Sequence, residues 1–491
     1  MNGNNSRSER ESMNNIAIVL AGGQGKRMRS ESPKVLCKVL GEPMLEWVLA
    51  ACENAGIAKV CVIKGFRGDL IDEYIGGRKS KADITTVLQE EQLGTGHAVM
   101  QAEPLMERFA DGNVLILNGD APFIDAETIN SALEQHIASG SSVTVVTARI
   151  EDPTGYGRII RGENGLAGIV EHKDCTPAQL AVTEVNSGCY WFRTADLLEV
   201  LGEITNDNAQ GEYYLTDCIG LLMGKGKLAD AYTSRNPSVV LGANDRRALL
   251  ALNDIARAEI IGRHLDNGVE FTCTDGVSIG NSVTIGQGTV ICPGVVLRGS
   301  TSIGENCVIG HNCIIENTRV GNGVNLNNVQ AYDSVIDDDA KIGPFVQIRP
   351  GSHILRGVKI GDFVEIKNST IGEYTAVAHL TYVGDSDVGA NVNFGCGVVT
   401  VNYNGDKKFR TVIGDNAFIG CNTNLVAPVR VGNGAYTAAG STITKDIPDN
   451  ALAIERGRQE IKEDYAVKKL AHHRKKYEDI KNAQNNGGEK K

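Results

Sequence analysis

The chain contains no run of 18 apolar residues, which is about the length that a membrane-spanning helix requires. Residues 1 to 15 are mostly polar and lack the apolar segment of a secretory signal peptide. The 12 cysteines include no C-x-x-C pair and no zinc-ligand spacing, a pattern typical of reduced thiols in the cytosol. We therefore expect a soluble, cytoplasmic protein that begins with a disordered extension over residues 1 to 15.

The sequence also lacks an excess of basic residues. Its net charge of −11 argues against general binding to nucleic acid or to a membrane surface, so local cations must hold any anionic ligand. With 491 residues, the chain is long enough for two or three domains. Glycine, in contrast, is abundant: there are 57, well above the usual level of about 7%, and they concentrate in the second half.

The first apolar segment, IAIVLAGGQGKRMRSESPKVL at residues 16 to 36, joins a predicted strand to glycines and then to basic residues. This order suggests a phosphate-binding turn, but it fits neither common template. Arg27 stands where a P-loop requires Ser or Thr, and Met28 stands where a dinucleotide-binding turn requires its third glycine. The segment is therefore neither an ATPase loop nor an NAD loop.

Residues 16 to 243 alternate strand-like runs, such as IAIVL, KVCVI and VTVVTA, with helical stretches. This alternation predicts a mostly parallel α/β sheet that binds ligands at the carboxyl ends of its strands. Residues 244 to 268 predict one amphipathic linker helix, because apolar residues recur there at helical spacing. These residues are Leu249, Leu252, Ala256 and Ile260.

After residue 268 the hydrophobic period changes to six. An aliphatic residue occupies every sixth position from Ile279 to Ile315, and the pattern resumes at Ile342. Such a repeat predicts a parallel β-helix over residues 269 to 447, with flat sides that favour association. The break at TVNYNGDKKFRT, residues 400 to 411, predicts an extruded functional loop. Residues 448 to 491 predict a short basic helix followed by disorder.

Several motifs in order resemble a known family. LAGGQGKRMRSESPK resembles the nucleotide-binding signature of the sugar nucleotidyltransferases, and QLGTGHA, NGDAPFI, GYGRI and QGEYYLTD follow in that family's order. The six-residue repeat, AHLTYVGD and VNYNGDKKFRT narrow the resemblance to the bacterial N-acetylglucosamine-1-phosphate uridyltransferase/glucosamine-1-phosphate acetyltransferases. This resemblance covers about residues 16 to 460 and includes the six-residue repeat.

The resemblance implies a Rossmann-like nucleotidyltransferase domain, a helical connector and a left-handed parallel β-helix of hexapeptide repeats. It implies a cytoplasmic homotrimer that makes UDP-N-acetylglucosamine, a precursor of peptidoglycan and lipopolysaccharide. Acetyl-CoA would acetylate glucosamine 1-phosphate in the second domain. UTP would then transfer its uridyl group to N-acetylglucosamine 1-phosphate in the first domain, with release of pyrophosphate.

For the first site, the resemblance implies one or two Mg²⁺ ions held by Asp120 and Asn244, while Arg27 and Lys34 balance phosphate charge. Asn244 could instead cap the linker helix. Lys26 stands where the family usually has Ser or Thr. The positions that match contacts to UTP and UDP-N-acetylglucosamine are Leu20, Ala21, Gly22, Gly23, Arg27, Lys34, Gln89, Gly94, Thr95, Asn118, Gly119, Asp120, Gly157, Glu171, Asn186 and Asn244.

For the second site, transfer of an acetyl group to an amine needs a base, and His379 matches the family's catalytic histidine. Glu365 matches a position that orients this base. The sugar-phosphate pocket is matched by Arg349, Lys367, Tyr382, Asn393 and Lys408. The acetyl-CoA channel is matched by Cys396, Asn402, Tyr403, Cys421, Ala439, Arg456 and Lys462. The two cysteines replace the usual Ala and Ser, and a covalent route through Cys421 is an alternative to direct transfer.

Two other functions share this architecture. In ADP-glucose pyrophosphorylases a β-helix only oligomerises or regulates, and in exchange-factor subunits of translation the whole chain is a non-catalytic scaffold. His379, Tyr382 and the Lys408 loop argue against the first alternative, because a spacer has no use for them. Arg27, Lys34 and Asp120 argue against the second.

Overall fold

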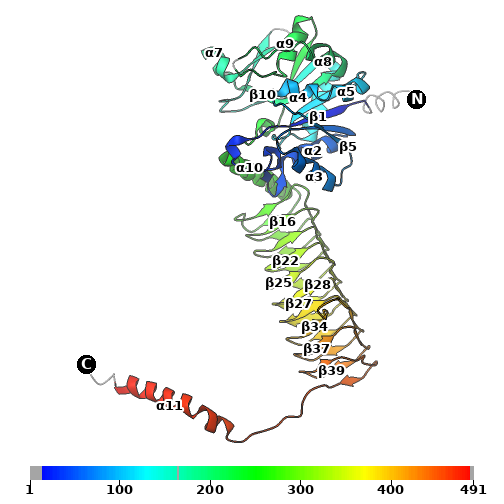
Figure 1. Cartoon of the computed structure of the whole chain (residues 1–491), viewed down its shortest axis with the longest axis vertical. Coiled ribbons are helices and arrows are strands. Elements are labelled where there is room, and N and C mark those ends of the chain that lie inside the picture. The colour runs from blue at the N-terminus through cyan, green and yellow to red at the C-terminus, as the bar shows by residue number, and fades with distance from the viewer. Residues whose placement is uncertain (1–13, 163–164, 209, 487–491) are drawn as a thin grey trace. The chain divides into compact units, whose positions relative to one another are not determined.

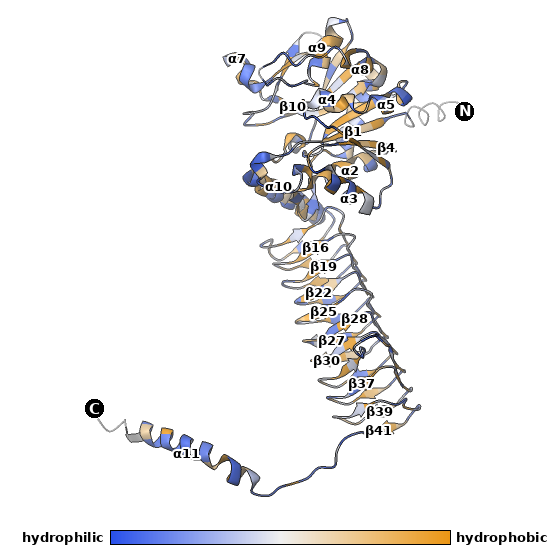
Figure 2. Cartoon of the chain, in the orientation of Figure 1, coloured by the Kyte–Doolittle hydropathy of each residue, from blue (hydrophilic) through white to orange (hydrophobic). Residues whose placement is uncertain are grey.

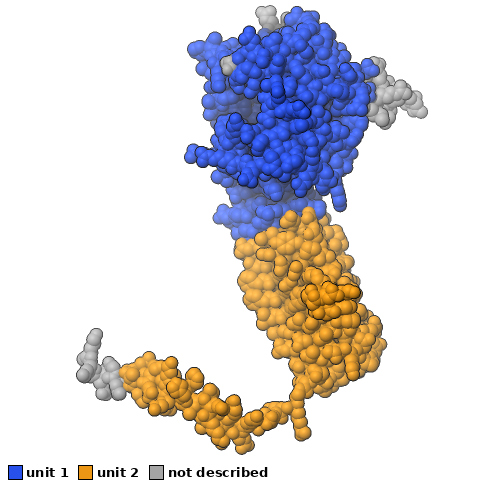
Figure 3. Space-filling model, viewed as in Figure 1, with its two compact units in different colours: residues 1–285, 293–300 blue, residues 286–292, 301–491 orange. Residues whose placement is uncertain are grey.

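The computed structural model describes residues 14–162, 165–208 and 210–486, and the chain forms two compact units (Figures 1 and 3). Unit 1 comprises residues 1–285 and 293–300, and unit 2 comprises residues 286–292 and 301–491. Most of the predicted N-terminal extension, residues 1–13, lies outside the described residues, as do residues 487–491 at the end of the predicted tail.

A mixed β-sheet forms the centre of unit 1, with the strand order β11-β7-β10-β6-β1-β4-β5. Neighbouring strands pair in parallel except β10, which is antiparallel to both β6 and β7. The prediction of a mostly parallel sheet is confirmed for this main order of strands, with β10 as its exception, and the attached hairpin of β8 and β9 is also antiparallel. The strands are β1 (Ile16–Ala21), β4 (Lys59–Lys64), β5 (Asp83–Leu88), β6 (Asn113–Asn118), β7 (Val143–Arg149), β10 (Glu184–Arg193) and β11 (Ala229–Thr233), with β8 (Arg158–Gly162) and β9 (Gly165–Val170) as a hairpin on β10 and β2 (Lys38–Val39) and β3 (Glu42–Pro43) as a separate pair.

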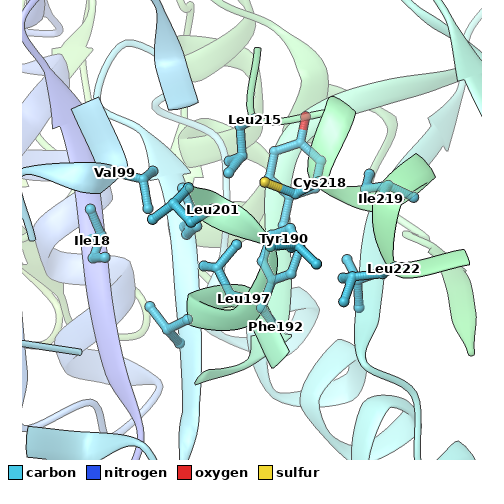
Figure 4. Close-up of a cluster of buried hydrophobic side chains, with 14 of the residues drawn as sticks. Ile18, Val99, Tyr190, Phe192, Leu197, Leu201, Leu215, Cys218, Ile219 and Leu222 are labelled. Carbon is cyan, nitrogen blue, oxygen red and sulfur yellow. The ribbon is translucent and has the colours of Figure 1, made fainter. Parts of the chain in front are cut away.

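Both faces of this sheet are covered by helices, so alternate residues of β1 enter two different hydrophobic cores. Ile16 and Ile18 pack with residues of α4, α5, α8 and α9. Figure 4 shows Ile18 in this cluster. Ala17 and Val19 pack with residues of α2, α3 and α6. Burial on both faces explains why the strands read as continuous apolar runs (Figure 2). The helices are α2 (Met44–Asn54), α3 (Gly68–Gly77), α4 (Thr95–Met100), α5 (Glu103–Met106), α6 (Ala126–Ser139), α7 (Pro177–Leu180), α8 (Thr194–Leu201) and α9 (Asp217–Gly224), with the 3₁₀ turns η1 (Lys26–Met28), η2 (Lys34–Leu36), η3 (Glu107–Phe109), η4 (His172–Asp174) and η5 (Pro237–Val240).

Helix α10 (Arg246–Asp266) is the predicted linker helix, and the four apolar residues predicted for its packed face are buried. Asp245 caps its N-terminus, since its carboxylate accepts hydrogen bonds from the backbone N–H groups of Arg247 and Ala248 at 3.0 and 2.9 Å. The alternative interpretation of Asn244 as the cap is therefore wrong by one residue. Unit 1 also contains the first short strands of the repeat, which are β12 (Glu270–Phe271), β13 (Ser278–Ile279), β14 (Thr284–Ile285) and β16 (Val296–Arg298).

Unit 2 is a solenoid of short parallel strands that stack into three sheets, one strand per sheet in each coil (Figure 1). Ile291, Ile303, Ile309 and Ile315 are at most 4% exposed, as the six-residue period predicts. The first sheet contains β15 (Val290–Ile291), β18 (Val308–Ile309), β21 (Asn325–Leu326), β24 (Lys341–Ile342), β27 (Lys359–Asp362), β30 (Ala376–His379), β33 (Asn393–Phe394), β36 (Phe418–Ile419), β39 (Tyr436–Thr437) and β41 (Leu452–Ala453).

The second and third sheets complete the prism. The second contains β19 (Ile314–Glu316), β22 (Val329–Tyr332), β25 (Val346–Ile348), β28 (Glu365–Lys367), β31 (Tyr382–Gly384), β34 (Val399–Val401), β37 (Asn424–Val426) and β40 (Thr442–Ile443). The third contains β17 (Ser302–Ile303), β20 (Arg319–Val320), β23 (Val335–Ile336), β26 (His353–Ile354), β29 (Thr370–Ile371), β32 (Ser386–Val388), β35 (Thr411–Ile413) and β38 (Val429–Val431).

The solenoid continues through residues 316 to 341, where the six-residue pattern fades. Coils there are shorter, because Ile314 pairs with Gln330 and Arg319 pairs with Val335, each 16 positions further along the chain. At one tight turn Asn317 adopts a left-handed backbone with φ of 49°. The six-residue pattern that resumes at Ile342 therefore marks the return of the longer coils. The stack of coils has no gap over residues 316 to 341.

The predicted loop leaves the solenoid between β34 and β35. Ser386 pairs with Thr411, and the 25 positions between them accommodate the insertion. The loop folds back on itself through an antiparallel bridge between Tyr403 and Lys408. Arg410 anchors its end by donating a hydrogen bond to the backbone oxygen of Ser386 at 3.1 Å.

After β41, the tail contains the exposed helix α11 (Tyr465–Asn486), in the region where a basic helix was predicted. Within the described parts of the chain, every helix is too short or too polar to cross a membrane. All twelve cysteines lie in those parts, and each is a free thiol.

Candidate active sites

The glycine segment after β1 lies at the carboxyl end of the sheet, beside the ends of β4 and β6. A Cβ atom at Gly65 would lie 2.6 Å from the backbone oxygen of Gly22, so the turns after β1 and β4 approach closely. Gly25 has a φ of 62°, and a Cβ there would lie 2.8 Å from the Cβ of Lys34. Position 25 requires glycine because of its backbone angle and because the Lys34 side chain packs against it.

Three residues far apart in the sequence meet beside this turn. The Lys34 ammonium donates a hydrogen bond to Asn244 Oδ1 at 2.7 Å and forms an ion pair with Asp120 Oδ2. Asp120 follows the end of β6 and Asn244 precedes α10. The side chain of Arg246 donates to the backbone oxygen of Met28 at 3.0 Å, which ties the start of α10 to the glycine segment. The two oxygen donors predicted to hold Mg²⁺ therefore converge on one positive charge.

The chemistry of these two donors fits Mg²⁺, which prefers oxygen ligands and retains water or phosphate oxygens in its remaining positions. Among the residues that the structure describes, no group of three or more His, Cys, Asp or Glu side chains is arranged to hold a metal. The Asp120 and Asn244 pair supplies one carboxylate and one amide oxygen. Such a pair suits an ion that is shared with a phosphate ligand.

Two adjoining cavities, of about 700 and 290 Å³, open at this edge of the sheet. Of the residues predicted for the first site, all but Ala21 and Gly119 line one or both cavities. Ala21 is buried, and the backbone N–H of Gly119 donates to Leu20 O at 2.9 Å, so both shape the strand ends from behind. The lining also includes residues that the sequence did not single out, which are Gln92, Thr154, Tyr156, Tyr190, Glu212 and Tyr214. Four of these six lie within the motifs QLGTGHA, GYGRI and QGEYYLTD.

The smaller cavity is closed by two predicted motifs, QLGTGHA and QGEYYLTD, that pack against each other. The Thr95 hydroxyl accepts a hydrogen bond from the backbone N–H of Leu215 at 3.1 Å. Gly94 has a φ of 111°, and a Cβ there would lie 2.6 Å from the backbone oxygen of Tyr213. Buried Gln89 donates from its amide nitrogen to Gly94 O at 3.1 Å, which fixes the orientation of its side chain.

The larger cavity contains the residues predicted to bind the sugar. Asn186 donates from its amide to the Tyr190 hydroxyl at 2.7 Å. A Cβ at Gly157 would lie 3.3 Å from Glu171 Oε1, so a larger residue there would crowd the carboxylate. Burial raises the pKa of Glu171, and two neighbouring carboxylates act in the same direction. These groups are hydrogen-bond acceptors and donors of the kind predicted to bind sugar hydroxyls.

In unit 2, the predicted base lies on one edge of the first sheet. His379 ends β30 directly opposite Asp362, which ends β27, and His379 Nδ1 is 3.9 Å from Asp362 Oδ2. The same turn position in successive coils, two residues beyond the paired positions of β30, β33, β36 and β39, is occupied by His379, Cys396, Cys421 and Ala439. The predicted base and three predicted acetyl-CoA residues therefore form one line, and Arg456 extends it by donating to Ala439 O at 3.0 Å.

Within this chain, Asp362 is the carboxylate that lies beside the predicted base. Glu365, predicted to orient His379, forms an ion pair with Arg349 at 2.7 Å, and its orienting role stays a prediction. Asp362 lies next to His379 and belongs to none of the motifs that carry the family resemblance. Asp362 precedes His379 by one coil, and this spacing could have identified it. The spacing can be used, however, only after the register of the coils is known.

Three predicted cations gather on the second sheet and the extruded loop. Arg349 and Lys367 follow one another in successive coils, since the backbone N–H of Arg349 donates to Ile366 O at 2.8 Å. The Lys408 ammonium lies within hydrogen-bonding reach of Lys367 and lowers the pKa of Lys367. Like charges repel at this range, so the cluster is suited to a dianionic phosphate that neutralises it.

The remaining predicted residues of this site surround the cation cluster or lie apart from it. Buried Asn402 donates to the Tyr382 hydroxyl at 3.4 Å and also to Asp385. Partial burial opposes ionisation of Asp385, but hydrogen bonds from Asn402 and another amide outweigh it and lower the pKa of this carboxyl. The Tyr403 hydroxyl donates to a loop carbonyl at 2.6 Å. Asn393 begins β33 on the first sheet, and Lys462 lies in the tail with its ammonium 3.7 Å from Glu460.

Comparison with protein families matches both units. The nucleotidyl transferase family matches residues 16–237, and the bacterial transferase hexapeptide family, defined by six repeats, matches residues 333–368 and 410–445. The solenoid is accordingly a left-handed parallel β-helix of hexapeptide repeats.

Curated proteins of several bacteria are similar along nearly the whole chain. The bifunctional protein GlmU of Acetivibrio thermocellus is 47% identical over 455 residues, which cover 92% of this chain and 97% of that protein. The GlmU proteins of Clostridium perfringens and of a Geobacillus species are 48% and 46% identical, over 93% and 91% of this chain and 99% and 97% of their own lengths.

Proposed function

The chain belongs to the family of the bifunctional protein GlmU, and from this premise we propose how its two reactions are distributed over its residues. It is a bifunctional enzyme that combines a nucleotidyltransferase with a hexapeptide acetyltransferase. The similarity extends over both units and over almost the full length of the relatives. This extent favours two activities over a β-helix that acts only as a spacer and over a non-catalytic scaffold.

The second unit acetylates glucosamine 1-phosphate. Arg349, Lys367 and Lys408 bind the phosphate, and His379 accepts a proton from the sugar amine as its nitrogen attacks the acetyl carbonyl of acetyl-CoA. The new amide C–N bond forms and the C–S bond breaks, so coenzyme A leaves as a thiol. The line of Cys396, Cys421 and Ala439 leads to His379, which supports this route for the acetyl donor. No cysteine intermediate is required.

The first unit transfers the uridyl group. A phosphate oxygen of N-acetylglucosamine 1-phosphate attacks the α-phosphorus of UTP, and pyrophosphate leaves. Arg27 and Lys34 stabilise the phosphate charge, while Glu171 and Asn186 orient the sugar. Mg²⁺ held by Asp120 and Asn244 would supply further charge neutralisation at the phosphates. No side chain needs to act as a base, because the attacking oxygen is already anionic.

We also propose that three copies associate through the β-helix. Phe345 and Phe363 stack at 5.3 Å between ring centroids at one corner of the solenoid, and Leu380 follows there; all three are more than half exposed. This apolar corner separates His379 from Tyr382, so the base lies on one side of the prism and Lys367 and Tyr382 lie on the neighbouring side. Exposed apolar ridges of this kind favour burial against another copy.

The observation that carries the proposal for the first site is the convergence of Asp120 and Asn244 on one charge beside the glycine turn. The test is to incubate the protein with glucosamine 1-phosphate, acetyl-CoA, UTP and Mg²⁺ and to follow thiol and pyrophosphate separately. We expect thiol release without UTP, and pyrophosphate release only after acetylation or when N-acetylglucosamine 1-phosphate is supplied. With glucosamine 1-phosphate as the only sugar phosphate, pyrophosphate without thiol, or neither product, would contradict the two-site assignment.

A further inference from the structure

The side chain of Lys34 lies where the proposed Mg²⁺ ion would bind, and the inference from this position rests on that proposed site. Its ammonium contacts both Asp120 and Asn244, which are the two oxygen donors proposed for the ion. The Lys34 side chain is only 14% exposed. Its stem lies against Gly25, where an added Cβ would be 2.8 to 3.5 Å from the Cβ, Cγ and Cδ atoms of Lys34. The lysine is therefore held in place from both ends.

We propose that Lys34 is a placeholder cation: its ammonium occupies the metal position between Asp120 and Asn244, and it must leave that position before a divalent ion can bind. Two positive charges cannot share one carboxylate and one amide oxygen at contact distance, because their repulsion is of the same order as the attraction that each gains. The ammonium balances the Asp120 charge while the site holds no metal.

This exchange couples the metal to the nucleotide. An ammonium has three N–H donors and prefers anionic acceptors, so a triphosphate in the adjoining cavity offers Lys34 an alternative partner. When Lys34 moves to the phosphate, Asp120 and Asn244 become available together. The phosphate supplies both the ligand that displaces the lysine and the oxygens that complete the coordination of the ion. The metal is thereby expected to bind weakly on its own and tightly with its substrate.

The test measures the binding of Mn²⁺ alone, without nucleotide, by electron paramagnetic resonance of the free ion. Lys34→Met removes the competing charge and keeps the apolar stem, so it should bind Mn²⁺ about fivefold more tightly than the unmodified protein, or better. Lys34→Gln, as a second variant, should act in the same direction. Lys26→Met is the matched control, because Lys26 is an exposed lysine of the same loop; its affinity should change less than twofold. Circular dichroism verifies that each variant is folded.

The outcomes of these measurements distinguish the placeholder role of Lys34 from general electrostatics and from a metal site elsewhere. Unchanged or weaker Mn²⁺ binding in folded Lys34→Met and Lys34→Gln would overturn the placeholder role. An equal gain in Lys26→Met would overturn it as well, since the effect would then be general electrostatics. Asp120→Asn separates this inference from the proposed function: if it leaves Mn²⁺ binding intact, the metal lies elsewhere and the proposed site itself is wrong. Loss of binding in Asp120→Asn with no gain in Lys34→Met would reject only the placeholder.

Discussion

The two candidate sites are built in opposite ways. In unit 1, Lys34, Asp120 and Asn244 meet although Lys34 and Asn244 are 210 residues apart, because three loops end at the same edge of one sheet. In unit 2, His379 and Asp362 meet because they occupy the same place in successive coils. A sheet edge brings together residues that share no spacing, whereas a solenoid converts a fixed spacing directly into contact. Mutations should therefore act differently on the two sites.

The largest effect should follow from removing unit 2. A chain that ends after α10, at residue 268, should lose acetyl transfer completely and retain uridyl transfer, because the residues proposed for uridyl transfer all precede that point. It should also be monomeric, since the proposed association uses the β-helix. Light scattering and the two product assays measure these outcomes. A truncated protein that is still trimeric would show that unit 1 is the assembly element.

Substitution of the base should have the next largest effect. His379→Ala should lower the rate of acetyl transfer by about 10²–10⁴-fold, which is the usual contribution of a positioned general base. Uridyl transfer from supplied N-acetylglucosamine 1-phosphate should be unchanged. The measurement is thiol release over a series of pH values, in which the variant keeps only the dependence due to the substrate amine. A variant with a wild-type rate and profile would show that the histidine is structural.

Asp120→Ala tests the other site in the same way. It should lower uridyl transfer by about 10²–10³-fold, as expected when the ion that would neutralise the developing phosphate charge loses one of its two proposed protein ligands. Acetyl transfer should be unaffected, and EDTA should reproduce the same selective loss in the unmodified protein. Pyrophosphate release assays on both preparations provide the comparison. Loss of both activities in a folded variant would contradict the independence of the sites.

A smaller effect is expected from the cation cluster. Lys408 lowers the pKa of Lys367, so phosphate binding should weaken as pH rises, beginning below the ordinary lysine value of 10.5. Lys408→Met should weaken binding of N-acetylglucosamine 1-phosphate at neutral pH by about 10- to 100-fold and should move this alkaline loss to higher pH. Product inhibition of acetyl transfer across pH measures both. An unmoved alkaline limb would mean that the two lysines do not interact.

The smallest predicted effect concerns Asp362, which we expect to position His379 rather than to contact substrate. Because both side chains are about half exposed, Asp362→Asn should lower kcat for acetyl transfer by only about two- to fivefold and leave KM unchanged. Asp362→Glu should restore part of the loss. A change confined to KM would assign Asp362 to substrate binding instead.

Sequence and structure agree most where a pattern repeats. The buried aliphatic positions of the β-helix and the apolar face of α10 follow directly from periods of six and of about 3.6 residues. The six-residue pattern fades where a local turn shortens the coil, as at Asn317, although the predicted β-helix continues there. One interpretation failed where two neighbouring polar residues competed for one role, as Asn244 and Asp245 did at the helix cap. The antiparallel orientation of β10 within a mostly parallel sheet could not be predicted from the residues of β10.

By itself, the sequence determined the two kinds of architecture, their order along the chain, the family, and the residue types that each site offers. Periodicity and glycine spacing are local properties, and the hydrophobic effect acts on them in the same way wherever they occur. Only the tertiary structure decided which charges meet: Lys34 between Asp120 and Asn244, Arg349 against Glu365, and Asp362 beside His379. Electrostatic interactions depend on distances of a few ångströms, and those distances exist only after the strand register and the loop paths are set.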